Sequence, residues 1–199
     1  FRSSEADPDV WMKAAVKPDG EEYYEYISVY VDDILCISHS AKETMSMIAK
    51  DFKFKKDEVK PPEIYLGARL EKKQLNRKWI WTMSSGDYVK ATIKNVEVRL
   101  QEKGRILLSR ATTPMSSDYK PELDGTHVLD SDGITMYQEL IGELRWAIEI
   151  GRVDILHEVS VLSSYQAAPR EGHLEQLLHF FAFLKKHPKL TLYFDPNCA

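Results

Sequence analysis

The chain has 199 residues, of which 43% are hydrophobic and 29% are charged. This length and composition allow a buried core in one or two domains, and no apolar run reaches the roughly 18 to 20 residues that a transmembrane helix needs. The formal net charge of −4 does not by itself indicate a nucleic-acid-binding protein. Two cysteines, Cys36 and Cys198, are too few for a disulfide framework and predict a reducing compartment. The opening FRSSEADPDVW does not resemble a secretory signal and is typical of the interior of a longer protein.

The charges are unevenly distributed along the chain. Residues 1–33 contain nine acids and three bases, a local charge of −6, whereas residues 69–110 contain eleven Lys or Arg and four acids, a local charge of +7. An acidic centre beside a basic surface would suit a phosphate polymer that is held near metal ions. Solvated helix faces give the same counts, so the distribution alone does not decide between the two interpretations.

The first predicted elements form a β-hairpin. Tyr23–Val31 is rich in Tyr, Ile and Val with polar residues between them, which predicts a strand. Ile34–Ser38 predicts a second, short strand. Asp32 and Asp33 are therefore expected to occupy a two-residue hairpin turn.

A helix and a second hairpin are predicted next. Ser40 is expected to cap a helix over AKETMSMIAKDF, with Glu43 three residues after the cap. A charged connection, Lys53–Lys60, leads to two prolines. The segments EIYLGARLEK and KWIWTM alternate apolar and polar residues, which predicts a hairpin with its turn near Gln74–Arg77.

The second half of the chain is predicted to be mainly helical. An apolar stripe with helical spacing begins after Ser85, and Gly104 is expected to end that helix. A long loop at about 111–133 consists of turn formers without an apolar period. Further helices are predicted over 134–150, 153–166 and 172–186, and LTLYF predicts a final short strand. The fold class expected from this order is α+β.

The Asp32–Asp33 pair is unfavourable in a hairpin turn, because such turns favour Asn-Gly or Asp-Gly and because two like charges repel. The simplest interpretation is an exposed turn that water solvates. The apolar strands on both sides favour a second interpretation, in which the turn lies at the edge of a packed sheet and a cation compensates the carboxylates. Mg²⁺ binds through one or two carboxylates plus substrate phosphates, and paired Mg²⁺ ions support in-line phosphoryl transfer.

The tetrapeptide Tyr30-Val31-Asp32-Asp33 resembles the YxDD box of reverse transcriptases, and SVYVDDILCIS resembles the version in copia-type LTR retrotransposon polyproteins. The resemblance continues in the same order from near Phe1 to about Asp195. YxDD alone is moderately specific, whereas the ordered series is strongly so. The other matching segments are ADPDVW, IYLGARLE with Leu66-Gly67, Thr113-Pro114-Met115, YQELIGELRWA and GRVDILHEVSVLSSYQAAPREGH.

The resemblance implies an RNA-directed DNA polymerase, a nucleotidyltransferase that uses Mg²⁺, with Mn²⁺ as an alternative. Asp32 and Asp33 would then be the catalytic metal ligands, and Tyr30 and Val31 would lie against the primer end or the template. Leu66 and Gly67 would position the primer strand, although a plain strand with Gly at a bulge is an equal alternative. The implied partners are an RNA template, a DNA primer and deoxynucleoside triphosphates, with no membrane partner.

The resemblance also implies a division of the chain. Residues 1–82 would be the C-terminal part of a palm, residues 83–194 a helical thumb or connection, and residues 195–199 the start of a linker to an RNase H domain. The fingers, a third carboxylate and the nucleotide-selecting helix would lie before Phe1, so we expect no polymerase activity from this chain alone. The implied location is intracellular, in a cytoplasmic virus-like particle or in the nucleus.

The sequence departs from the family pattern at three places. Val153 stands where the family usually has Pro, and FLKKHP replaces its usual Tyr-Leu-Lys-Gly-Thr. The Lys53–Pro62 stretch lacks the expected Asp-Leu-Gly. A non-catalytic remnant of a retroelement, retaining only the fold or nucleic-acid binding, is therefore the main alternative, and a helical interaction module is a third.

Other residues have both a structural and a functional interpretation. Trp79 and Trp81 alternate on a strand, where packing is favoured over base stacking. Lys90, Lys94 and Arg99 lie on the polar side of one helix and would either contact backbone phosphates or be solvated. The remaining candidates are interpreted as structural: His173 as a capping or packing residue, Arg152 and Asp154 as a cap or ion pair, and His157, His179 and His187 without a zinc-ligand spacing.

Overall fold

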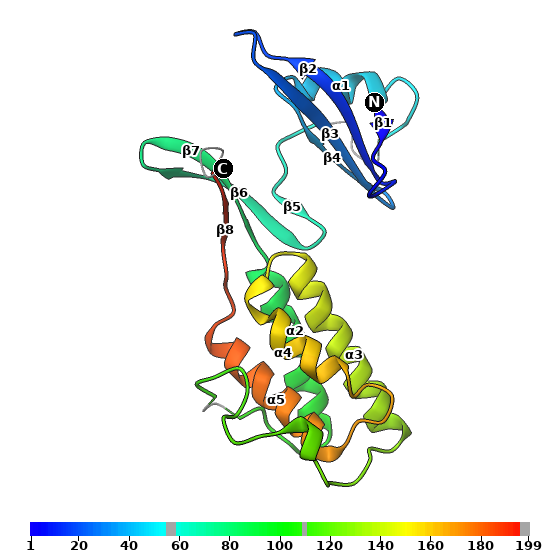
Figure 1. The fold of residues 1–199 in the computed structure, drawn as a ribbon, viewed down its shortest axis with the longest axis vertical. Helices are drawn as coiled ribbons and strands as arrows, with labels where there is room; N and C mark the ends of the chain where they lie inside the picture. Colours follow the sequence, from blue (N-terminus) through cyan, green and yellow to red (C-terminus); the bar gives the residue numbers. More distant parts are fainter. Residues whose placement is uncertain (55–58, 109–110, 196–199) are drawn as a thin grey trace. The chain divides into compact units, whose positions relative to one another are not determined.

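The computed structural model describes residues 1–54, 59–108 and 111–195. It divides into two compact units, Phe1–Leu66 and Gly67–Ala199. In the described ranges the structure contains two antiparallel sheets and five α-helices, in agreement with an α+β composition (Figure 1). The predicted linker at 195–199 lies, except for Asp195, outside the described residues, as does part of the Lys53–Lys60 connection.

The first unit is a four-stranded antiparallel sheet in the order β1-β2-β3-β4, followed by helix α1. Residues alternate between its two faces because successive side chains of a strand point in opposite directions. Helix α1 contacts β4, and its buried residues are Thr44 and Met45. The elements are β1 Arg2–Ser3, β2 Val10–Val16, β3 Glu22–Tyr30, β4 Asp33–Ile37, α1 Ala41–Ile48 and, at the end of the unit, β5 Ile64–Tyr65.

The second unit contains a sheet and a group of helices. Strands β6 and β7 form a hairpin, and β8, from the end of the chain, pairs with the other edge of β7. The elements are β6 Ala68–Leu75, β7 Lys78–Ser84, α2 Gly86–Glu102, η1 Pro121–Leu123, α3 Ser131–Glu149, η2 Val153–Ile155, α4 Leu156–Ser163, α5 Glu171–Lys186 and β8 Leu192–Phe194.

The apolar core of the second unit lies between helices α2, α3, α4 and α5. Each helix contributes residues spaced three or four apart, as expected for a helix with one buried face. Tyr137 is completely buried, and its hydroxyl donates a hydrogen bond of 2.8 Å to the carbonyl of Leu162. The other residues of this core cluster with at most 1% exposure are Val96, Leu100, Leu140, Ile141, Leu144, Ile155, Val159, Leu162, Leu177, Phe180, Phe181, Ala182 and Leu184.

The helices predicted in the second half are present, with boundaries that differ by a few residues. Helix α3 begins at Ser131 because the side chain of Asp130 accepts a hydrogen bond of 2.8 Å from the backbone of Gly133. The segment predicted as one helix over 153–166 is a 3₁₀ turn followed by α4. The predicted long loop contains the single turn η1.

Two features of the fold differ from expectation. Strands β1 and β2, which form half of the first sheet, were not expected from the sequence. The units divide between Leu66 and Gly67 rather than at residue 82, because β8 pairs with β7 and so joins the β6–β7 hairpin to the helical unit.

Candidate active site

The hairpin that carries the Asp pair has Val31 and Asp32 as its two turn residues. Asp33 is the first residue of β4 and pairs with Tyr30, the last residue of β3. The prediction that Asp32 and Asp33 both occupy the turn is therefore wrong by one residue. The two carboxylates belong to different parts of the hairpin, one to the turn and one to a strand.

Val31 adopts a left-handed backbone conformation, with φ of 53°. A β-branched residue with positive φ is an outlier, because its side chain crowds the backbone. Only the first of the two turn residues has positive φ, which is the pattern of a type II′ turn, where Gly is preferred. Such strain persists only when the surrounding structure holds it, and it is concentrated at functional sites.

The residues of the turn are exposed to solvent. The side chain of Val31 is 89% exposed, and Tyr30, Asp32 and Asp33 are also exposed. The expected cost of burying the two carboxylates therefore does not arise. The exposed position still suits a metal site that substrate completes, since Mg²⁺ retains several waters and takes few protein ligands.

The strand register places two of the candidates, Tyr30 and Asp33, on one face of the first sheet. Asp33 and Tyr30 are paired, and Ser28 pairs with Leu35 two residues further along, so all four lie on the same face. Tyr65 also reaches this face, because its hydroxyl donates a hydrogen bond of 3.1 Å to the Oγ of Ser28. The residue before Leu66 is thus linked to the strand that ends at Tyr30.

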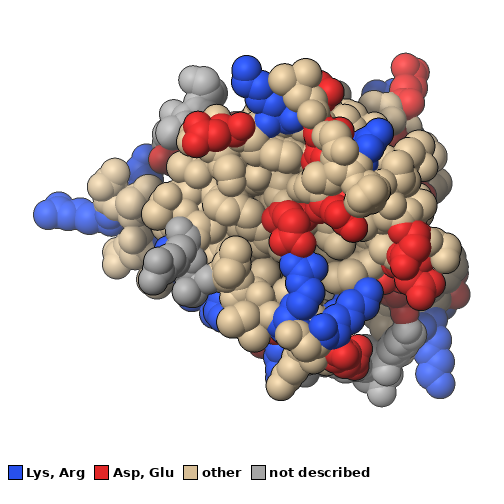
Figure 2. Space-filling model, turned by 90° about the horizontal axis from the view of Figure 1, so that it is seen from below, with Lys and Arg blue, Asp and Glu red and all other residues tan. Residues whose placement is uncertain are grey.

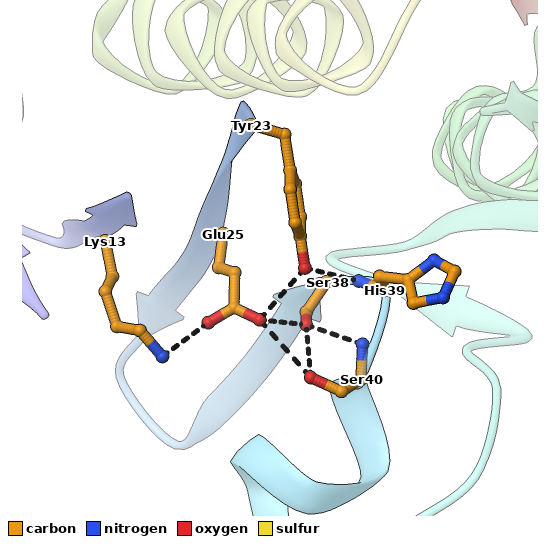
Figure 3. A network of polar contacts seen from close by, with 6 residues as sticks. All are labelled: Lys13, Tyr23, Glu25, Ser38, His39 and Ser40. Carbon is orange, nitrogen blue, oxygen red and sulfur yellow. Dashed lines mark hydrogen bonds and ion pairs between the residues drawn. The ribbon is translucent and has the colours of Figure 1, made fainter. Parts of the chain in front are cut away.

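The opposite face of the hairpin contains a buried carboxylate that the sequence analysis missed. Glu25 is 2% exposed, and its Oε1 accepts hydrogen bonds from the Oγ of Ser38 at 2.5 Å and the hydroxyl of Tyr23 at 3.2 Å (Figure 3). Its Oε2 lies 2.8 Å from the Nζ of Lys13 on β2. Ser40, the residue before α1, contacts the same carboxylate at 3.4 Å.

The Glu25 network fixes the stem of the hairpin. It connects β2, β3, the end of β4 and the start of α1 through one carboxylate (Figure 3). The hydrogen bond from Lys13, followed by that from Ser38, lowers the pKa of Glu25 to about 2, although burial opposes the shift. The sequence contained one indication of this buried carboxylate. Glu25 lies between Tyr23 and Ile27 on the otherwise apolar side of the predicted strand.

The donor set of the turn suits a hard cation but is small. Carboxylate oxygens are preferred ligands of Mg²⁺ and Mn²⁺. Among residues 1–54, 59–108 and 111–195, no group of three or more His, Cys, Asp or Glu side chains is arranged to hold a metal ion. Asp32 and Asp33 thus supply oxygen donors of the type that these cations prefer, but the two side chains alone do not make a metal site.

The other predicted nucleic-acid-binding residues are exposed or lie in turns. Leu66 and Gly67 form the two-residue turn between β5 and β6, with φ values of 53° and 89°. This turn replaces the bulge that was the alternative interpretation. Lys90 and Lys94 are exposed on α2 of the second unit, and Lys90 lies 4.0 Å from Asp87.

Ion pairs reduce the basic character expected for residues 69–110. Arg99 pairs with Glu139 at 2.5 Å, and Arg105 pairs with Glu175 at 2.6 Å. Figure 2 shows acidic and basic side chains interspersed on the face that it draws, rather than one continuous basic patch. Part of the positive charge of this sequence segment is therefore paired with neighbouring acids.

The residues interpreted as structural have structural roles in the folded chain. His173 is buried; its Nδ1 accepts a hydrogen bond of 3.0 Å from the backbone of Arg170, and its Nε2 lies 3.0 Å from the carbonyl of Pro121. Arg152 is buried and forms two hydrogen bonds to Asp154. Its third hydrogen bond, of 3.0 Å, goes to the carbonyl of His187 at the end of α5.

A comparison with curated proteins found a similar sequence. A transposon Ty5-1 protein of Saccharomyces cerevisiae is 28% identical over 164 residues, which cover 80% of this chain and 48% of that protein. The similarity supports a retrotransposon origin. The chain spans about half the length of this curated relative.

The other two comparisons found no match. No family model matches the sequence, and no solved structure matches the fold at a significant level. In the part of the chain that the structure describes, no helix is both long enough and apolar enough to cross a membrane.

Proposed function

We propose that this chain is part of a retrotransposon reverse transcriptase and that its Asp32–Asp33 pair takes part in nucleotidyl transfer to a primer 3′-hydroxyl. The observation that carries the proposal is the β3–β4 turn, in which a strained Val31 presents two adjacent exposed carboxylates. The similarity to a Ty5-1 transposon protein supports the retrotransposon origin in this proposal. Because the chain spans 48% of that relative, the polymerase activity is proposed for a complete protein that contains this chain.

Each residue of the turn has a role in this proposal. Asp32 supplies a carboxylate from the turn, and Asp33 supplies a second carboxylate from the first position of β4. When bound, Mg²⁺ ions would increase the nucleophilicity of the primer oxygen and neutralise charge on the triphosphate. Tyr30 lies on the same face as Asp33 and contacts the primer end, and Val31 contacts the nucleic acid from the turn.

The strands on either side of the turn are connected to neighbouring elements. Catalytic groups must be kept close to the productive geometry by residues that are themselves fixed. The Glu25 network fixes the stem on one face, and the Tyr65–Ser28 hydrogen bond contacts the other face. Asp33 is thus positioned by the sheet, and Asp32 by the two-residue turn next to it.

The proposal is tested by primer extension with a complete parent protein that includes these residues. We expect Asp32→Asn to reduce nucleotide incorporation by about a thousandfold or more, because removing a metal-binding carboxylate removes transition-state charge stabilisation. Asp19→Asn is the matched control, since Asp19 is an exposed acid near the β2–β3 turn of the same sheet. Unchanged incorporation by Asp32→Asn would refute the proposal.

The alternative of a non-catalytic remnant predicts a different result. In that case the complete protein would be inactive with or without the substitution, while the chain would still fold. The absence of a third metal-ligating side chain near the pair, among the described residues, is the observation that keeps this alternative open.

A further inference from the structure

Three aromatic side chains share one face of the second sheet. Trp79 and Trp81 are two residues apart on β7 and therefore point to the same side. Phe194 on β8 pairs with Trp81 and joins them. Trp79 is 68% exposed and Phe194 is 50% exposed. Trp79 was expected to pack in a core or at an interface, and it does not pack in the core of this unit. Large exposed aromatic groups of this kind mark interaction sites.

The two ends of this face differ. At the inner end, Met83 and Leu192 pack beside Gly151, where an added Cβ would lie 3.4 Å from both side chains. The outer end, with Trp79 and the turn of the hairpin, extends away from helices α2 to α5 (Figure 1). Packing within the second unit therefore accounts for the inner apolar residues but not for the outer aromatic ones.

Positive charge accompanies the aromatic side chains. Lys72 pairs with Trp81 across the hairpin, and its Nζ lies 5.1 Å from the centroid of the Trp81 ring. Arg77 occupies the exposed turn. Over residues 68–84 the sequence has five Lys or Arg and a single acid, Glu71. The outer end of the hairpin is thus both aromatic and basic.

We propose that this aromatic–basic face (Lys72, Arg77, Trp79, Trp81 and Phe194) binds single-stranded nucleic acid. Bases stack on Trp79 and Phe194, and backbone phosphates lie near Lys72 and Arg77. Sheet faces that carry aromatic residues bind unpaired bases in this way, and basic residues around them follow the phosphates. A protein partner would need a complementary acidic surface around an apolar centre, whereas a single strand supplies both chemistries in every nucleotide.

This inference does not depend on the chemistry of the Asp pair. The surface belongs to a different compact unit, and binding can be measured without nucleotide incorporation. Failure of the polymerase proposal would therefore leave this one standing, and the reverse also holds.

Fluorescence anisotropy of labelled oligothymidylate and oligouridylate with the whole 199-residue chain tests the proposal. We expect Trp79→Ala to weaken binding about tenfold, since stacking contributes strongly for each base. We expect Phe194→Ala to weaken it by a similar factor, and Lys72→Gln to weaken it and to reduce its salt dependence. Binding to a duplex of the same length should not respond to Trp79→Ala, because paired bases are not free to stack on the ring.

The same sheet provides matched controls on its opposite face. Tyr193 is the neighbour of Phe194, is 54% exposed and points to the other side, so Tyr193→Ala should change affinity less than about twofold. Lys73→Gln changes the same charge as Lys72→Gln from the opposite face. Equal losses for the variants of both faces, or no loss for Trp79→Ala, would overturn the proposal. Self-association of the chain that requires Trp79, without oligonucleotide binding, would also overturn it and would assign the surface to a protein partner.

Discussion

Val31 is the turn residue with a positive φ, and the resulting backbone strain is expected to lower the free energy of unfolding. Replacing Val31 with Gly removes the side chain that makes a positive φ unfavourable, which stabilises the folded state by about 1 to 3 kcal/mol. Gly also makes the unfolded chain more flexible, which offsets about 1 kcal/mol of this stabilisation. We expect Val31→Gly to raise the free energy of unfolding by about 1 kcal/mol. Val31→Ala keeps a Cβ and should give no such gain. Urea unfolding of the two variants checks this, and a Gly variant less stable than the Ala variant would contradict the strain.

Glu25 is expected to make the stability of the first unit pH-dependent. Its folded-state pKa of about 2 lies below the ordinary value of 4.5, so its contribution is fully present above pH 4.5 and is lost as the pH falls toward 2. The lowered pKa corresponds to a contribution of about 2 kcal/mol to the free energy of unfolding. This value allows for solvent screening of the partly exposed partner Lys13. Glu25→Gln should therefore be less stable than the natural chain at pH 7 and should lose less stability on acidification.

Urea unfolding at about pH 7 and about pH 3, followed by circular dichroism, measures this difference. Glu22→Gln changes an exposed acid of the same strand and serves as the control. If the natural chain and Glu25→Gln lost stability in parallel, the buried network would not be a source of the pH dependence.

At the residue scale, the sequence located the Asp pair but not its geometry. The predicted position of the turn was wrong by one residue because Val normally favours an extended strand conformation. Val31 instead adopts a positive φ in the turn, which the sequence pattern does not indicate. The Glu25 network was not predictable for another reason. Its partners Lys13 and Ser38 come from segments on either side of β3, and only the strand register brings them together.

At the scale of elements, the start of α5 depends on the absence of a side chain. A Cβ on Gly172 would lie 2.0 Å from the Oδ2 of Asp124. That carboxylate cannot move freely, since it accepts hydrogen bonds of 2.6 Å from Tyr119 and of 2.6 and 2.9 Å from Thr126. We expect Gly172→Ala to lower the free energy of unfolding by about 2 kcal/mol through lost hydrogen bonds.

A second glycine gives the opposite expectation and so serves as the control. Gly142 lies in α3 with no atom within 4 Å of an added Cβ. Gly142→Ala should raise the free energy of unfolding by about 0.5 to 1 kcal/mol through its helix propensity. Urea unfolding compares the two variants, and effects of the same sign would show that the Asp124 contact does not restrict Gly172.

The predictability of the elements followed the strength of their patterns. Helices α2, α3 and α5 have long apolar stripes and were predicted within a few residues of their bounds. Strand β2 was missed because VWMKAAV has little alternation, with two Ala after a Lys. Its assignment depends on pairing with β3 over seven residues rather than on its own composition.

At the scale of the whole molecule, the two units differ in their cores. Among the described residues of the first unit, Ile27 and Met45 are the buried apolar side chains, whereas the second unit has an extensive buried core. Tyr24, Tyr26, Tyr30 and Ile37 share an exposed face of the first sheet. A sheet with so little buried apolar surface is marginal in water.

We therefore expect residues 67–199 to unfold cooperatively on their own and residues 1–66 not to do so. Thermal unfolding of the two fragments by circular dichroism, with dispersion of amide signals in NMR spectra, measures this. A sharp transition for residues 1–66 would contradict the expectation.

Besides strands β1 and β2, the boundary between the units was not apparent from the sequence. It depends on the pairing of Trp81 with Phe194, which are far apart in the chain. The hairpin pattern and the short terminal strand were both predicted, but no local signal connects them. Contacts of this range follow from the folded chain as a whole.

The position of β8 has a consequence for how the protein is made. The ribosome releases Leu192–Phe194 after every helix of the second unit has already emerged, so the sheet is completed last. Until then, the free side of β7 offers unpaired peptide groups to any extended segment of another polypeptide. A chain truncated before Leu192 should therefore aggregate during synthesis, even though its helices are intact.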